Sequence, residues 1–74
     1  MALKNKPLQD LIQIVSFGGG LDFDASTRST QDLIQIVSHA KEGARLVLRG
    51  VSGRSTQDLI QIASHGKGTV VFAD

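Results

Sequence analysis

Gln31-Asp32-Leu33-Ile34-Gln35-Ile36-Val37-Ser38 is one of three copies of an octamer in this chain of 74 residues. An identical copy runs from Gln9 to Ser16, and a third, from Gln57 to Ser64, differs only by Ala63 in place of valine. The copies begin 22 and then 26 residues apart. Self-similarity at such a spacing is the sequence signature of a repeat architecture. The octamer is therefore predicted to form the same structural element three times.

Each octamer has the apolar spacing of an amphipathic helix. Leu33, Ile36 and Val37 recur at i, i+3 and i+4, which places them on one face at the helical period of 3.6 residues. Ser29 and Ser55 open Ser-Thr-Gln-Asp sequences, a capping-box pattern with Asp in place of the usual Glu. Glycines after each octamer are typical helix stops. We predict helices at about residues 7–17, 30–40 and 56–65, with Pro7 in the first turn of the first one.

Three segments after the helices predict strands. Residues 21–25 and 45–49 alternate apolar and polar side chains, and residues 69–73 are rich in β-branched and aromatic types. The apolar-leaning start at residues 1–4 is a further candidate strand. The predicted order is (β)αβαβαβ, in one domain that covers residues 1–74. Its units are approximately 1–20, 21–43 and 44–68, with a closing strand at 69–74.

Short links from helix to strand favour parallel strands joined by right-handed crossovers, which place every helix on the same face of the sheet. The fold class is therefore predicted as α/β, a two-layer repeat with a small parallel sheet and helices on one face. The predicted rows that face the helices are Leu21, Leu46 and Val70, and Phe23, Leu48 and Phe72. The predicted rows on the open face are Asp22, Val47 and Val71, and Asp24, Arg49 and Ala73. We expect Asp24 and Arg49 to pair across the two strands.

Composition limits the function classes. The chain has no Cys and a formal net charge of +1, so it lacks a thiolate metal site and the basic footprint of nucleic-acid or anionic-membrane binding. No apolar run approaches the ~20 residues of a membrane span, and no signal-peptide apolar region follows Met1. The composition indicates no cellular compartment.

The segments Leu21-Asp22-Phe23-Asp24-Ala25-Ser26 and Leu46-Val47-Leu48-Arg49-Gly50-Val51 resemble the strand segment of leucine-rich repeats. This resemblance implies a solenoid-like stack of strand-and-helix units. Ser26 stands at the family's Asn/Cys ladder position in one unit. Serine here departs from the family's Asn or Cys, so the family's polar ladder is not expected.

A narrower similarity, from Gln57 to Gly68, is to transcription-activator-like effector repeats. Ile62-Ala63-Ser64-His65 with the following glycines looks like the first helix and base-reading loop of that family. Residues 69–72 read as a strand where that family has its second helix, so nucleic acid is not an expected partner. The verbatim repetition, together with consistent charges and glycines at the helix ends, is typical of an engineered or idealised repeat protein.

Two sets of residues have the composition of ligand sites. His39 and His65 lie at equivalent helix ends, but neighbouring helix axes are about 8–10 Å apart, too far for two such positions to share one ion. Gly18-Gly19-Gly20 follows a helix, whereas phosphate-binding loops precede one. Both sets are therefore interpreted as ordinary helix ends. We expect neither a metal nor a cofactor.

The connectors from strand to helix are better candidates for weak anion binding, because they present an arginine beside helix-start N–H groups. The candidate residues are Arg28, Ser29, Thr30, Gly53, Arg54, Ser55 and Thr56. The alternative is that these segments are capped connectors without a ligand. Asp22 and Asp24 could in principle act as paired carboxylates, but they are expected on an open, solvated face.

The predicted function is that of a structural, self-associating repeat protein without catalytic activity. His and Asp lie at opposite ends of each helix, so no Ser-His-Asp set is indicated. A homo-oligomer is expected because one sheet face is open, the last strand has no charge to guard its edge, and near-identical units can stack between chains. The candidate self-association residues are Val47, Val71 and Ala73. The alternative is a binding module that uses the open face or the arginine loops for a protein or an anionic ligand.

Overall fold

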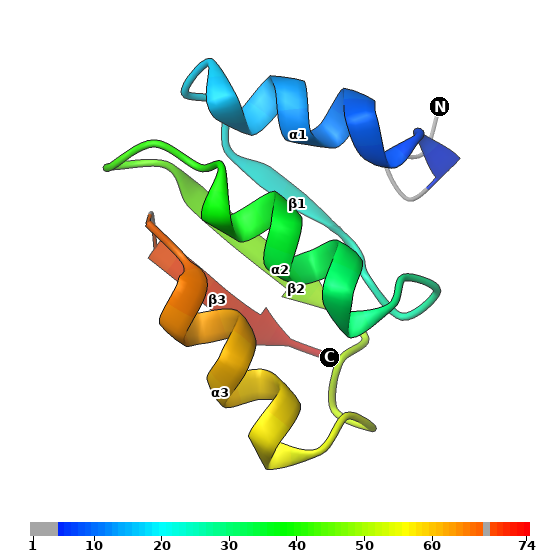
Figure 1. Ribbon diagram of the computed structural model, residues 1–74. Coiled ribbons are helices and arrows are strands. Elements are labelled where there is room, and N and C mark those ends of the chain that lie inside the picture. Colours follow the sequence, from blue (N-terminus) through cyan, green and yellow to red (C-terminus); the bar gives the residue numbers. More distant parts are fainter. Residues whose placement is uncertain (1–4, 68) are drawn as a thin grey trace.

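A computed structural model describes residues 5–67 and 69–74 of the chain (Figure 1). The elements in order are α1 (Leu8–Ser16), β1 (Leu21–Asp24), α2 (Thr30–Ser38), β2 (Arg45–Arg49), α3 (Thr56–His65) and β3 (Thr69–Ala73). The strands form one parallel sheet in the order β1-β2-β3, and the helices lie on the same face of it in Figure 1. The predicted two-layer α/β fold is confirmed. The candidate strand at residues 1–4 lies outside the described residues.

Serine side chains begin α2 and α3 as the sequence predicts. Ser29 Oγ accepts a hydrogen bond from the Asp32 backbone N–H at 3.1 Å, and Ser55 Oγ accepts one from Asp58 at 3.1 Å. Each bond satisfies one of the N–H groups that a helix start leaves without an internal partner. Pro7 has no capping side chain and stands just before α1, so this helix begins one residue later than predicted.

The ends of the first two helices differ from each other. Gly18 has a φ of 96°, and its N–H donates to the Val15 carbonyl at 3.0 Å, so glycine closes α1 as predicted. Helix α2 ends at Ser38 rather than near Ala40. The N–H groups of His39 and Ala40 donate to carbonyls only three residues back, which tightens the last turn and ends the regular helix early. Helix α3 has the predicted bounds.

The core lies between the helices and the sheet face they cover. The strand register places Leu46 opposite Leu21 and Val70, and Leu48 opposite Phe23 and Phe72, as predicted. The central members Leu46 and Leu48 are completely buried. They join the helix residues that the octamer pattern assigns to the core, and Leu33, Ile36 and Val37 are likewise completely buried.

The open face differs from the prediction in its ion pair. Asp24 does lie opposite Arg49 in the register, but Arg49 pairs with Asp22, with Nε donating to Oδ1 at 2.6 Å and Nη2 to Oδ2 at 3.1 Å. The Asp24 carboxylate instead accepts the Ser26 backbone N–H at 2.9 Å, while the long arginine side chain reaches the diagonal neighbour. The hydrogen bonds from Arg49 lower the pKa of the exposed Asp22 carboxyl below its usual value.

Val47 is also less accessible than expected, since only 8% of it is exposed although it faces away from the helices. It lies between Asp22 and Val71 in the register, on the strand that ends with Arg49. A residue on a central strand with neighbours on every side keeps little free surface, even on an open face.

Replacing Leu33 with alanine tests the assigned core face. The side chain is completely buried in α2, so Leu33→Ala should lower the free energy of unfolding by about 2–5 kcal/mol, as for other large-to-small core changes. Urea unfolding followed by circular dichroism measures this difference. Gln35→Ala on the exposed side of the same helix is the control and should change stability by less than about 0.5 kcal/mol. Equal unfolding midpoints for the two variants would show that the face is assigned wrongly.

Candidate functional site

A repeated contact of basic side chains lies along the starts of the helices. Lys6, Arg28 and Arg54 occupy the same position, three residues before the first glutamine of each octamer. Arg54 Nη2 donates to the backbone carbonyls of Ala25, at 3.0 Å, and of Arg28. Its Nη1 donates to Thr30 Oγ1 at 2.9 Å. The loop before α3 is thereby fixed to the loop before α2.

One of these contacts recurs one step earlier in the chain. Arg28 Nη2 donates to the Lys6 carbonyl, which is the equivalent of the Arg28 carbonyl that accepts from Arg54. Thr30 Oγ1, which accepts from Arg54, itself donates to Asp58 Oδ2 at 3.4 Å. The contact made by Arg54 thus extends into α3. A guanidinium presents several donors in a rigid planar fork, which suits it to hold several oxygen acceptors at once. The arginines therefore join successive helix starts.

Several residues of the predicted anion site already make hydrogen bonds within the chain. Ser29 and Ser55 use their hydroxyl oxygens to cap α2 and α3, and both terminal nitrogens of Arg54 donate within the chain. Gly53 and Thr56 lie exposed beside Arg54. An anion at this loop would have to compete with the carbonyl oxygens for the Arg54 donors. Anion binding by these residues stays a prediction, and the structure assigns Arg54 a contact that does not need one.

The two histidines lie at exposed helix ends as interpreted from the sequence. His39 Nδ1 lies 2.7 Å from the Gln35 carbonyl oxygen, and His65 Nδ1 lies 2.8 Å from that of Gln61. A carbonyl oxygen can only accept, so each of these contacts is a hydrogen bond in the form of the ring that carries a proton on Nδ1. Within residues 5–67 and 69–74, no three His, Cys, Asp or Glu side chains form a group that could hold a metal ion. No helix in those ranges is long and apolar enough to cross a membrane.

The last helix is less covered than the one before it. Leu33 and Val37 in α2 are buried, whereas the equivalent Leu59 in α3 is only partly buried and Ala63 is exposed. Ile60 is 54% exposed on the same flank of α3. Helix α2 contacts both α1 and α3, while α3 has a helical neighbour on one side only within the described chain (Figure 1).

The last strand repeats this pattern. Val70 and Phe72 are only partly buried, although their register partners on β2 are completely buried. The Thr69 N–H donates to Ala44 and the Ala73 carbonyl accepts from Gly50, so these alternate residues of β3 point their backbone groups toward β2. By the alternation of a parallel ladder, the N–H and C=O groups of Val70 and Phe72 point to the opposite edge. No described strand pairs with that edge.

A shallow hollow marks the same end of the molecule. Its lining includes Leu59 from α3, Phe72 from β3 and Val51 from the connector between β2 and α3. Of the three residues predicted for self-association, Val71 and Ala73 lie partly exposed on β3, while the burial of Val47 leaves it little surface to contribute. Sequence reasoning missed Ile60, because the near-identical octamers do not show which copy lacks a neighbour.

We compared the chain with protein-family models, with curated proteins and with solved structures, and none of the three comparisons gave a significant match. The resemblance to leucine-rich repeats therefore stays a prediction from the strand segments. The second helix expected of a transcription-activator-like effector repeat is replaced here by strand β3 (Thr69–Ala73).

Removing the Arg54 contact should loosen α3 from the rest of the protein. Hydrogen bonds from a charged group are worth about 1.5–3 kcal/mol, so Arg54→Ala should lower the free energy of unfolding by that order. Arg54→Lys should recover only part of it, because an ammonium lacks the planar fork that reaches three oxygens. Chemical unfolding measures both variants. Arg45→Ala, at an exposed position of β2, is the control; equal effects at positions 45 and 54 would contradict the assigned contact.

Proposed function

We propose that this protein is a structural repeat module that works by associating with further copies of itself and has no catalytic activity. The surface that associates is its C-terminal end, formed by the free edge of β3 and the exposed flank of α3. The observation that carries the proposal is the loss of cover at equivalent positions, from Leu33 and Val37 in α2 to Leu59 and Ala63 in α3.

A second copy is the occupant that fits this surface best. In repeat proteins each unit buries its apolar face against a neighbour, and a terminal unit without a neighbour leaves that face open. Within this chain α2 and α3 carry nearly the same octamer and pack on each other. An octamer of a second copy therefore has the side chains needed to pack on the exposed flank of α3. The contact between copies would continue the α2–α3 contact that the chain itself contains.

The free edge of β3 supports the same proposal. Unpaired strand edges readily accept a strand from another chain, and natural proteins guard them with charged residues, especially lysine. Strand β3 has the sequence Thr-Val-Val-Phe-Ala and holds no charged side chain. An unguarded edge beside a partly exposed apolar flank favours association over a monomeric state.

Placing a charge on this edge should weaken association. Val71 lies partly exposed on β3, and Val71→Lys adds the kind of side chain that protects edges. Sedimentation equilibrium across micromolar concentrations should show the parent protein as an oligomer and the variant shifted toward the 7.9 kDa monomer. Gln35→Lys adds the same charge at an exposed position of α2 and should leave the mass unchanged. A folded parent that stays monomeric at high micromolar concentration would overturn the proposal.

A further inference from the structure

We infer that copies of this protein associate head to tail: the flank of α1 that faces away from α2 docks on the exposed flank of α3 in the next copy. This inference rests on the proposed self-association and adds which two surfaces meet. Three sets of observations carry it: the burial of equivalent helix positions, the location of the exposed apolar side chains, and the acceptors that Arg54 uses inside the chain.

The burial of equivalent residues assigns one octamer position to the flank that faces the preceding helix. Ile36 in α2 and Ile62 in α3 are completely buried, but the equivalent Ile14 in α1 is only partly buried. At this position it is the first helix that is less buried than the others. At the positions of Leu59 and Ala63 it is the last helix that is less buried. Ile14 is therefore assigned to a flank that a preceding helix covers, and α1 has no preceding helix in the described chain.

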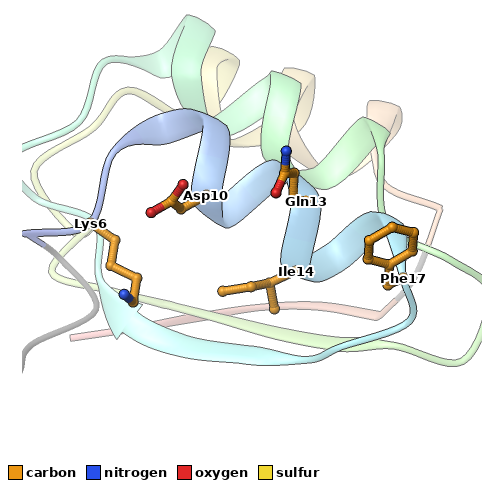
Figure 2. Close-up of a pocket in the computed structure, with 5 residues that line it drawn as sticks. All are labelled: Lys6, Asp10, Gln13, Ile14 and Phe17. Atoms are coloured by element: carbon orange, nitrogen blue, oxygen red, sulfur yellow. The ribbon is translucent and has the colours of Figure 1, made fainter.

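The flank of α1 is hollowed and carries an exposed aromatic ring. A shallow hollow beside the helix is lined by Lys6, Asp10, Gln13, Ile14 and Phe17. Figure 2 shows Lys6 and Ile14 pointing to the same side of α1, with Phe17 at the end of the hollow. Phe17 is 86% exposed, and Ile60 on α3 is 54% exposed. Among the described residues, the two most exposed large apolar side chains thus lie at opposite ends of the row of helices.

The internal contact between α2 and α3 shows how such flanks meet. The side chain of Val37 in α2 lies 3.7 Å from where a Cβ on Gly66 would stand, and the Lys67 N–H donates to the Val37 carbonyl at 3.3 Å. The residue at the Val37 position thus faces the next helix and its following turn. Ala63 holds that position in α3 and is exposed. A following helix from a second copy would cover it together with Ile60.

The acceptors for a basic side chain are also repeated at the C-terminal end. Inside the chain, Arg54 binds the Ala25 carbonyl, the Arg28 carbonyl and Thr30 Oγ1. In the next unit of the chain the equivalent acceptors are the Val51 carbonyl, the Arg54 carbonyl and Thr56 Oγ1.

The two loops also share their geometry. The Arg28 N–H donates to the Ala25 carbonyl at 3.2 Å, and the Arg54 N–H donates to that of Val51 at 3.0 Å. Thr56 is exposed where Thr30 is partly buried. Lys6 holds the position of Arg28 and Arg54 at the start of α1, so a docking α1 brings an ammonium to this set of oxygens. An ammonium lacks the guanidinium fork, but a cation placed beside these oxygen acceptors would still favour one orientation of the incoming copy.

The two docking surfaces are different, so the contact is heterologous. Such contacts generate closed rings when the rotation between copies closes, and open chains when it does not. A symmetric dimer that pairs two C-terminal ends would instead be isologous, and it would leave the α1 flank uninvolved. The two arrangements respond differently to a charge placed on one flank.

Two variants, each blocked at one flank, distinguish these arrangements. Ile14→Lys charges the α1 flank and Ile60→Lys charges the α3 flank, and circular dichroism checks that each remains folded. At a concentration at which the parent protein is associated, each variant alone should sediment as a 7.9 kDa monomer. A one-to-one mixture should form a dimer of twice that mass, since each partner contributes its intact flank. Phe17→Lys, at an exposed position on the same hollow as Ile14, replaces Ile14→Lys if that variant unfolds.

The outcomes separate this inference from the proposed function. An Ile14→Lys variant that associates as strongly as the parent, with an Ile60→Lys variant that stays monomeric in the mixture, overturns the head-to-tail arrangement but leaves self-association standing. A parent protein that is monomeric throughout overturns both. Restoration of the dimer by mixing is the result expected only of two complementary surfaces.

Discussion

Burial of the aliphatic helix stripe between neighbouring helices and the sheet is the constraint on which this structure depends. A 74-residue chain with no cysteine has no disulfide to hold it, and small domains gain little from a single core. Leu33, Ile36 and Val37 are completely buried because α2 has a helix on each side and a strand ladder below it. Within the described residues the first and last helices have a helical neighbour on one side only, and the partial burial of Ile14 and the exposure of Ile60 follow from that difference.

The arginine contacts act on the same stacking by different means. Apolar burial has no direction, whereas the fork of Arg54 holds two backbone carbonyls of the preceding loop and the Thr30 hydroxyl at the start of α2 in fixed positions. The contact thus sets how far one helix start lies from the next and which loops meet. Arg28 donates to the Lys6 carbonyl as Arg54 donates to the Arg28 carbonyl, so successive helix starts are joined by an equivalent hydrogen bond. The equivalent acceptors in the loop before α3 identify the surface on which a further helix would pack.

The fold could be predicted from the sequence because its signals are local and mutually consistent. The octamer period, the serine caps at Ser29 and Ser55 and the alternation in the strands all point to the same two layers. The pairing of Arg49 with Asp22 could not be predicted, because it depends on the use of Asp24 in a turn and on the reach of a flexible side chain. The exposure of Ile60 was also missed, since it is set by position in the row of helices rather than by the octamer itself. The role of Arg54 could have been suspected, because a basic residue precedes all three octamers at the same spacing.

Amide hydrogen exchange at the free edge of β3 tests most directly whether a second copy covers the C-terminal end. The N–H groups of Val70 and Phe72 point away from β2, so they should exchange quickly in a monomer and slow down once a partner covers the edge. Protection of these two amides should therefore rise with protein concentration, while that of Val71, which faces β2, changes less. Exchange at Val70 and Phe72 that stays fast and independent of concentration up to high micromolar protein would contradict the account.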